Sequence, residues 1–419
     1  MLDYKVDILK YQRSEDGSIM GKVRDYKESL TLHEQNKLSL IKRPPLSSGC
    51  DRTVTYQDFY SGKTVSALMF GSNSYLGTFV HKEAIQKAMD VTASFGIGAG
   101  GVPLLSGTNI YQNELEKTIA KVKGFDDTIL FSSGFTANIG AIIGLVRPNN
   151  LIIHDKLNHA SLLDGSLMSC AKMARYKHND PIDLEKVLSQ NHKDYPNGIL
   201  VITDGVFSMD GDIANLPEII NVVNKYNAIL LIDDAHATGV IGHKGKGTLS
   251  HFNIEQRDNI VVTGTLSKAI GAVGGFITAS KEIIDYLRVY ARSNMYSTAL
   301  PPSVCASSTE MFKIIESTDI VDKLKYNSDY MRESLKEKGF NTLKSQTAII
   351  PLIIKDEYLL TTISKDILDK GIIVNYIYPP AVQPTKARLR ISVMATHTKE
   401  DMDYFVSVLE EVDKKYNIR

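Results

Sequence analysis

The sequence has few cysteines and no excess of charge of either sign. Its three cysteines, Cys50, Cys170 and Cys305, lie far apart in the 419-residue chain and form no Cys-x-x-Cys pair. That spacing argues against a disulfide framework and favours free thiols in a reducing compartment. Lysine and arginine together number 48, as do aspartate and glutamate. No bulk electrostatic field therefore favours nucleic acid or an anionic membrane as a partner.

Long apolar runs are also missing. No stretch approaches the roughly 20 apolar residues that a membrane-spanning helix requires. The first 18 residues mix both charges and lack the apolar centre of a secretory signal. These absences predict a cytoplasmic protein without a transmembrane segment.

Several motifs for nucleotides and metals are absent as well. The chain has no GxxxxGK[ST] phosphate loop and no HExxH zinc motif. Its glycine-rich segment at residues 96–101 does not follow a strand, as a dinucleotide-binding fingerprint would. No nucleotide-binding loop and no metal site are expected.

What the sequence does contain is an alternation of helical and strand-like segments from about residue 113 onward. This alternation predicts an α/β domain with a mostly parallel sheet, whose ligands bind at the carboxyl ends of the strands. The expected helices lie at 113–122 and 137–145, and the expected strands at 128–131, 151–154, 198–203, 228–232, 259–263 and 275–278.

The regions before and after this alternation have different residue patterns. Residues 1 to about 45 are polar with helical spacing, and the segment after Pro301 and Pro302 resembles a small α+β unit with antiparallel strands. We therefore expect an N-terminal helical arm at 1–66, a large α/β domain at 67–302 and a small C-terminal α+β domain at 303–419.

The most informative stretch is NIVVTGTLSK, residues 259–268, followed by a glycine-rich segment. An apolar strand ends in hydroxyl residues and presents Lys268, where desolvation disfavours the charged form of the amine. A nucleophilic lysine that forms an imine beside a phosphate site suggests pyridoxal phosphate. Taken alone, the stretch also fits a surface lysine in a glycine-rich turn.

Other polar residues follow the remaining strands. Gly134 and Phe135 open a helix after the strand at 128–131, and their amides suit an anion, although Ser133 also fits an ordinary helix cap. His159 follows the next strand. There it suits either a ring that stacks on an aromatic cofactor or a core histidine whose hydrogen bonds are satisfied. Ser208 follows a third strand.

Asp233 and His236 form the sharpest of these signals. Asp233 ends an apolar strand, and a buried carboxylate needs a partner such as a cationic pyridinium nitrogen. The rival interpretation is a metal- or nucleotide-binding strand. Arg390 lies on a strand of the expected small domain, where its side chain suits either a substrate carboxylate or an internal salt bridge.

Together these motifs resemble the α-oxoamine synthases, which are pyridoxal phosphate enzymes of fold type I. The resemblance runs from about Phe70 to the C-terminus. The motifs that carry it are SSGFTAN, NHASLLDG, TDGVFSMDGD, IDDAHATGVIG, GTLSKAIGAVGG, YSTALPP and RLRISVMATH, at residues 132–138, 158–165, 203–212, 232–242, 264–275, 296–302 and 388–397.

The resemblance implies a role for each matching residue. Lys268 would bind the cofactor covalently, Asp233 would pair with its ring nitrogen, His236 with its ring oxygen, and His159 would stack on its face. The cofactor's remaining contacts would come from Gly134, Phe135, Ser208 and Thr265. Arg390 and Asn73 would bind the amino-acid carboxylate. The family is dimeric, so Ser297 and Thr298 would serve the phosphate of the neighbouring subunit.

The reaction implied is a decarboxylative condensation of an amino acid with an acyl thioester. Where many members carry an arginine, this chain has Val102 and Pro103, and Gln112 stands at a position that is often histidine. The surface near the acyl entrance is therefore more apolar, which favours a long or apolar acyl group. Other stretches of the sequence look closest to bacterial serine palmitoyltransferase. We therefore expect L-serine and a long-chain acyl-CoA as substrates and 3-ketosphinganine as product. The alternatives are glycine or alanine with another acyl thioester, as in 8-amino-7-oxononanoate synthase, or a fold type I aminotransferase.

Overall fold

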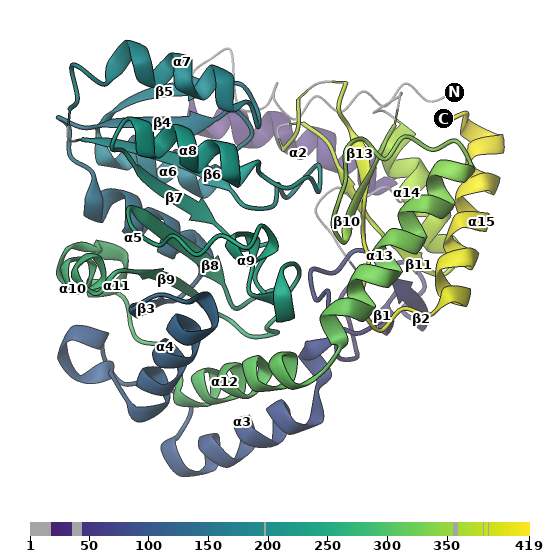
Figure 1. Ribbon diagram of the computed structural model, residues 1–419. Coiled ribbons are helices and arrows are strands. Elements are labelled where there is room, and N and C mark those ends of the chain that lie inside the picture. The colour runs from purple at the N-terminus through teal and green to yellow at the C-terminus, as the bar shows by residue number, and fades with distance from the viewer. Residues whose placement is uncertain (1–17, 36–43, 197, 355–358, 380, 384) are drawn as a thin grey trace. The chain divides into compact units, whose positions relative to one another are not determined.

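The computed structural model describes residues 18–35, 44–196, 198–354, 359–379, 381–383 and 385–419 (Figure 1). Its contacts divide the chain into two compact units. The larger unit is Asn73–Lys325, and the smaller one joins Met1–Ser72 to Tyr326–Arg419. These bounds differ from the expected ones at 66 and 302. The expected division into an arm and two domains stays a prediction.

A seven-stranded sheet forms the centre of the larger unit. Five neighbouring strands are parallel, while β9 runs antiparallel to both β3 and β8. The predicted fold class, an α/β fold with a mostly parallel sheet, is confirmed, and the antiparallel strand makes the sheet mixed. In spatial order the strands are β3 (Asp127–Phe131), β9 (Gly275–Ala279), β8 (Ile260–Thr265), β7 (Ile229–Asp233), β6 (Ile199–Asp204), β4 (Leu151–Asp155) and β5 (Lys172–Tyr176).

Helices cover both faces of this sheet, so its inner strands are apolar on both sides. On one face, Val262 and Ile232 pack with α7 (Pro181–Asn191) and α8 (Leu216–Lys225). On the other face, Val261 and Leu231 pack with the helices α5 (Gly134–Leu145), α6 (Ala160–Ser169) and α10 (Lys281–Tyr290). Neighbouring residues of one strand therefore enter different cores.

Within the seven-stranded sheet, β5 is the strand that the apolar pattern did not indicate. Its sequence KMARY is polar, and most of its side chains are exposed or half-buried because it lies at the edge of the sheet. An edge strand has only one neighbour and needs no continuous apolar run.

Three further helices complete the periphery of the larger unit. Figure 1 shows α3 (Lys82–Phe95) beside α12 (Pro302–Ser317), and the two helices pack together. α12 also packs on α4 (Ile110–Lys123), which is why it belongs to this unit and not to the C-terminal one. Two short helices, α9 and α11, span Thr248–His251 and Arg292–Met295.

The smaller unit contains two three-stranded sheets. In the first, β2 (Thr64–Met69) lies between β1 (Thr53–Gln57) and the short β11 (Ile372–Ile373). In the second, β13 (Arg388–Ser392) lies between and antiparallel to β10 (Ile349–Ile353) and β12 (Asn375–Ile377).

Its helices are α2 (Ile19–Gln35), α14 (Leu360–Asp369) and α15 (Lys399–Tyr416), while α13 (Ile320–Glu337) crosses the boundary between the units. Within the expected helical arm, α2 is described as Ile19–Gln35, and residues 1–17 and 36–43 lie outside the described residues. Among the helices that are described, none is both long and apolar enough to cross a bilayer.

Candidate active site

Acidic and hydroxyl residues meet at one edge of the large sheet. Asp155, Asp204, Asp233 and Thr265 are the last residues of β4, β6, β7 and β8. These four strands are parallel neighbours, so their carboxyl ends lie at the same edge. The prediction that ligand-binding residues gather at strand ends agrees with this arrangement.

Asp233 is buried and held in a fixed orientation. Its side chain accepts hydrogen bonds from the Asn138 amide at 2.7 Å and from the backbone N–H of Ala235 at 2.9 Å. One donor faces each carboxylate oxygen, so the group is fixed before any ligand arrives. A buried carboxylate of this kind is suited to a cationic N–H partner.

Asp204 lies beside Asp233 because the two residues are register partners on β6 and β7. Burial raises the pKa of the Asp204 carboxyl well above its usual range, and the nearby Asp233 raises it further. Two neighbouring buried carboxyls resist double ionisation, so this environment favours the protonated form of Asp204. Asp204 also accepts the backbone N–H of His159 at 3.0 Å, which fixes the start of α6.

His159 caps α6 and is exposed, with its ring near both Asp233 and Lys268. Its Nδ1 is 2.7 Å from the Ser161 hydroxyl. Burial lowers the pKa of His159; Asp233 opposes this shift and Lys268 adds to it. The imidazole is therefore neutral at physiological pH, which suits a ring that stacks on a cationic aromatic system.

His236 belongs to the loop after β7, where it meets the buried Tyr75. The Tyr75 hydroxyl lies 2.8 Å from His236 Nδ1 and 3.4 Å from Asn73 Oδ1. Tyr75 has a φ of 49°, which is uncommon for a bulky side chain and indicates local backbone strain. The sequence did not reveal this contact, because its partners are 161 residues apart.

Lys268 lies half-buried on the loop between β8 and β9. It affects the pKa of both His159 and Asp204, which places its amine among these side chains. Further along the loop Gly271 has a φ of 82°, and a Cβ there would lie 2.7 Å from Thr78 Oγ1. The loop is thus packed closely, and the lysine is carried by a rigid support.

The N-terminus of α5 provides the expected anion site. Ser133 accepts the amide of Thr136 in a capping box, while the amides of Gly134 and Phe135 lie in the first turn, where the helix has no acceptor for them. A Cβ on Gly134 would lie 2.9 Å from the Thr265 Cβ. The close approach brings the helix N-terminus against the end of β8, next to the lysine loop.

The remaining predicted residues are more scattered. Ser208 is half-buried in the loop after β6, and Ser297 and Thr298 are half-buried and exposed in the segment after α11. Arg390 is buried on β13 of the smaller unit, where it donates to the Ser392 hydroxyl at 3.0 Å. The functional roles of these residues stay predictions.

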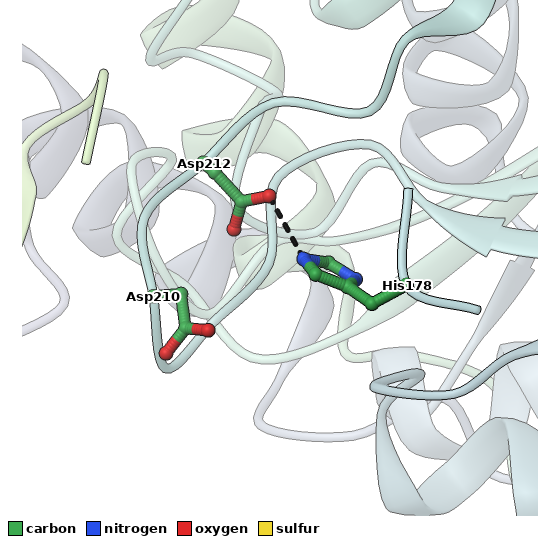
Figure 2. Close-up of side chains that lie close together, drawn as sticks. All are labelled: His178, Asp210 and Asp212. Atoms are coloured by element: carbon green, nitrogen blue, oxygen red, sulfur yellow. Dashed lines mark hydrogen bonds and ion pairs between the residues drawn. The ribbon is translucent and has the colours of Figure 1, made fainter. Parts of the chain in front are cut away.

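A cluster of charged residues fixes the loop that contains Ser208. The sequence did not reveal this cluster. Figure 2 shows His178 facing Asp212, with Asp210 nearby. His178 Nδ1 lies 3.0 Å from Asp155, and its Nε2 lies 3.0 Å from Asp212. Burial lowers the pKa of His178, but its hydrogen bonds to the two aspartates outweigh this and raise the pKa to about 10.

The cluster also has the spacing of a metal site. Ligand atoms of His178, Asp210 and Asp212 lie within 4.8 Å of one another. At neutral pH, however, both ring nitrogens carry protons and donate them to carboxylates, so His178 has no lone pair to offer a metal. The imidazolium itself supplies the positive charge between the aspartates.

A buried ion pair next to Asp233 was also missed. Lys123 at the end of α4 donates to Asp234 at 2.9 Å, and both side chains are 3% exposed. Asp234 further accepts the hydroxyl of Thr248 at 2.5 Å. This network fixes the backbone just after Asp233, and no motif in the sequence links residues 123 and 234.

The donor set of the larger unit fits pyridoxal phosphate. Lys268 offers an amine for the aldehyde, Asp233 an acceptor for the ring nitrogen, and His159 a neutral flat ring. Gly134 and Phe135 offer backbone amides for the phosphate. Each functional group of the cofactor therefore has a chemically matched partner in this cluster.

Comparisons with known proteins identify the family. The sequence profile of the family "Aminotransferase class I and II" matches residues 66–409. The chain is 44% identical to an 8-amino-7-oxononanoate synthase of Thermoanaerobacter pseudethanolicus, with 85% of this chain and 90% of the relative covered. It is 37% identical to the enzyme of that name from Bacillus pumilus, with 92% and 98% covered.

Solved structures share the fold. Serine palmitoyltransferase of S. paucimobilis matches with a TM-score of 0.89 at 27% identity, covering 96% of this chain and 100% of that chain. The 8-amino-7-oxononanoate synthase of Francisella tularensis matches with a TM-score of 0.71 at 27% identity, covering 84% and 99%.

The expectation of a serine palmitoyltransferase of sphingolipid synthesis is wrong. Curated relatives at 37–44% identity are 8-amino-7-oxononanoate synthases, whereas the serine palmitoyltransferase structures are 27% identical. The stretches behind that expectation include strand ends and cofactor loops, which different substrates share, and a shared backbone does not fix the substrate. The chain belongs to the aminotransferase class I and II family, in which it is an α-oxoamine synthase of fold type I, an acyltransferase that depends on pyridoxal phosphate.

Proposed function

We propose that the protein is an 8-amino-7-oxononanoate synthase. The observation that carries this proposal is the 40–44% identity to enzymes of that name from several bacteria, over 83–86% of the chain. This function was among the alternatives that the sequence left open.

The product's name defines the substrates of a decarboxylative condensation. Carbons 8 and 9, with the amino group, are what remains of alanine once its carboxylate is lost. Carbons 1 to 7 then come from a seven-carbon acyl thioester with a carboxyl function at its far end. In the reaction a bond forms between alanine Cα and the acyl carbon, the thiol leaves, and CO₂ is released.

The cluster around Lys268 accounts for the first steps. Pyridoxal phosphate supplies an electron sink for the bond at alanine Cα. In our proposal Lys268 holds the cofactor and then moves the proton at Cα, while Asp233 stabilises the positive ring nitrogen and His236 binds the ring oxygen. His159 covers the ring face and directs its Nε2 toward the substrate carboxylate.

Other residues position the ligands. Arg390 and Asn73 bind the alanine carboxylate in this proposal, and the first turn of α5 binds the phosphate. The cofactor-binding set is Gly134, Phe135, His159, Ser208, Asp233, His236, Thr265 and Lys268, joined by Ser297 and Thr298 from the neighbouring subunit of a homodimer. A cytoplasmic location is part of the same proposal.

The segment after the glycine-rich loop suits an aliphatic chain. Leu104 and Leu105 are 47% and 83% exposed, and Val102 and Pro103 precede them. The loop is anchored next to Thr298, because the amide of Ala299 donates to the carbonyl of Gly101 at 2.9 Å. We propose that this apolar surface contacts the methylenes of the acyl group.

A substrate panel tests the function. Purified protein with pyridoxal phosphate is given L-alanine, glycine or L-serine, each with a seven-carbon dicarboxylic acyl-CoA or with palmitoyl-CoA, while thiol and CO₂ release are followed. The expected active pair is alanine with the seven-carbon thioester, with 8-amino-7-oxononanoate identified by mass spectrometry. Turnover confined to another pair would overturn the proposal. Amino-group transfer without CO₂ would indicate an aminotransferase.

A further inference from the structure

A continuous chain of hydrogen bonds connects Asp233 to His159. The Asn138 amide, on α5, lies 2.7 Å from Asp233 Oδ2 and 2.8 Å from the Ser161 hydroxyl. The Ser161 hydroxyl in turn lies 2.7 Å from His159 Nδ1. Asn138 and Ser161 are 3% and 0% exposed, so water does not compete with these bonds.

The chemistry of the groups fixes the direction of the bonds that Asn138 makes. An ionised carboxylate only accepts, so the Asn138 atom facing Asp233 is the amide nitrogen. This orientation is supported at the other side, where Thr263 donates to Asn138 Oδ1 at 2.6 Å. The amide nitrogen has two hydrogens, and it gives one to Asp233 and the other to Ser161.

The Ser161 hydroxyl has one hydrogen, and we assign it to the hydrogen bond with His159. The serine oxygen accepts from Asn138 and has a second lone pair for a protonated Nδ1, but the backbone N–H of Ser161 already donates to Nδ1, so we assign the Ser161 O–H as a second donor to this atom. The backbone N–H of Ser161 also points to Nδ1, at 3.3 Å. With two donors facing Nδ1, the ring proton of a neutral His159 belongs on Nε2.

From this geometry we propose that Asn138 and Ser161 are positioning residues, which hold His159 as the neutral tautomer protonated at Nε2. The inference rests on the proposed function in assigning His159 a substrate-facing role. It gives His159 an N–H donor at the ring edge away from Ser161. It also couples the orientation of His159 to that of Asp233, although the two residues lie on different elements.

The surrounding charges agree with a neutral ring. Burial lowers the pKa of His159 and so does Lys268, against the opposing effect of Asp233 and Asp164. Asp204, which accepts the His159 backbone N–H, has a raised pKa and so adds little negative charge. A hydrogen on Nδ1 would also face the two hydrogens that the hydroxyl and the backbone N–H of Ser161 direct at this atom. An uncharged ring can lie over a cationic pyridine ring without like-charge repulsion.

Nitrogen NMR of histidine-labelled protein reads the tautomer directly. We expect His159 of the holoenzyme and of the cofactor-free protein to show a bare Nδ1 and a protonated Nε2, and to resist protonation at mildly acidic pH. Signals are assigned by comparison with His159→Asn. A wild-type protein with Nδ1 protonated would overturn the inference.

Two variants interrupt the chain of hydrogen bonds between Asp233 and His159. Ser161→Ala removes the hydroxyl donor, and Asn138→Ala frees the Ser161 hydroxyl to turn and accept. Both are expected to raise the pKa of His159 and to mix its tautomers, with kcat/KM for alanine reduced about tenfold through the loss of one ordered hydrogen bond. The matched control is Ser166→Ala on the same helix, whose buried hydroxyl donates to the Leu162 carbonyl at 2.7 Å and takes no part in the bonds between Asp233 and His159.

The outcomes separate this inference from the proposed function. If Ser161→Ala and Asn138→Ala leave the tautomer and pKa of His159 like those of Ser166→Ala, the inference fails even when alanine is the substrate. If another amino acid proves to be the substrate, the NMR result still decides the tautomer, and only the proposed function fails.

Discussion

The hydroxyl of Tyr75 lies 2.8 Å from Nδ1 of His236, and the ring of Tyr75 is fully buried. Its φ of 49° shows that the backbone is held in an unfavourable conformation to bring the hydroxyl there. Strain of this sort is retained where the surrounding packing requires one particular position of a side chain. We therefore treat the pair as part of the cofactor site.

The first prediction concerns Tyr75→Phe. Removing the hydroxyl keeps the packing but leaves His236 without this partner, so we expect cofactor affinity to fall about fivefold, in line with about 1 kcal/mol for one hydrogen bond. Fluorescence titration of the cofactor-free protein measures the affinity, with thermal unfolding as the control for fold. An affinity equal to that of the wild type would show that the contact does not orient His236.

The second prediction concerns Lys268→Ala. The variant is expected to fold, because Lys268 is half-buried on a loop, but to lose covalent cofactor attachment and turnover altogether. Borohydride reduction followed by mass spectrometry detects the attachment in the wild type and its loss in the variant. A variant that still turns over would remove Lys268 from its role.

The third prediction follows from Gly134. A Cβ at this position would lie 2.9 Å from the Cβ of Thr265, so Gly134→Ala should push the first turn of α5 away from the end of β8. We expect cofactor affinity to drop and stability to fall by about 1–3 kcal/mol. Gly98→Ala is the matched control, because no atom lies within 4 Å of its Cβ. Equal behaviour of the two variants would contradict the close-approach argument.

The fourth prediction is a pH dependence that belongs to His178. Its pKa is raised from 6.5 to about 10 in the folded protein, so folding binds a proton between these values. The stability from this group is fully present below about pH 6.5 and is lost as the pH rises through about 10.

His178→Gln tests it. The variant is expected to be about 2–3 kcal/mol less stable at neutral pH, since it loses hydrogen bonds to two buried carboxylates. The difference in unfolding free energy between wild type and variant should shrink as the pH rises from 7 to 10, as measured by denaturant titration. A difference that does not change with pH would mean that His178 is not charged in the folded state.

Much of the fold and of the cofactor chemistry could be predicted from the sequence. Asp233 and Lys268 were candidates because Asp233 ends one apolar strand, Lys268 closely follows another, and the carboxyl ends of parallel strands meet. A helix was expected at 137–145, and α5 spans Gly134–Leu145 in the structure, with Ser133 as its cap.

The pairings between distant residues could not be predicted. Asn138 and Asp233 are 95 residues apart, and their contact depends on how α5 packs on the ends of β7 and β8. His178 meets Asp155 and Asp212 only because β5 is the edge strand next to β4. β5 is polar, so its pattern of apolar residues did not indicate that it belongs to the sheet.

The substrate was the other point that the motifs could not fix. Residues such as Lys268 and His236 are proposed to bind the cofactor, and every member of the family needs that cofactor regardless of its substrate. The choice of L-serine and a long acyl chain therefore rested on stretches that carry little information about the acyl group.

The antiparallel strand β9 has a further consequence for Lys268. Thr265 and Gly275 are paired across β8 and β9, and the amide of Leu266 donates to the Gly274 carbonyl at 2.9 Å, so the lysine lies on a hairpin closed at its base. A closed loop confines its amine to a small volume and gives it a high effective concentration at one point. In the cofactor-binding role that we propose for Lys268, this amine would compete well against free amino acids in solution after each catalytic cycle, and the hairpin would favour prompt return of the enzyme to its resting form.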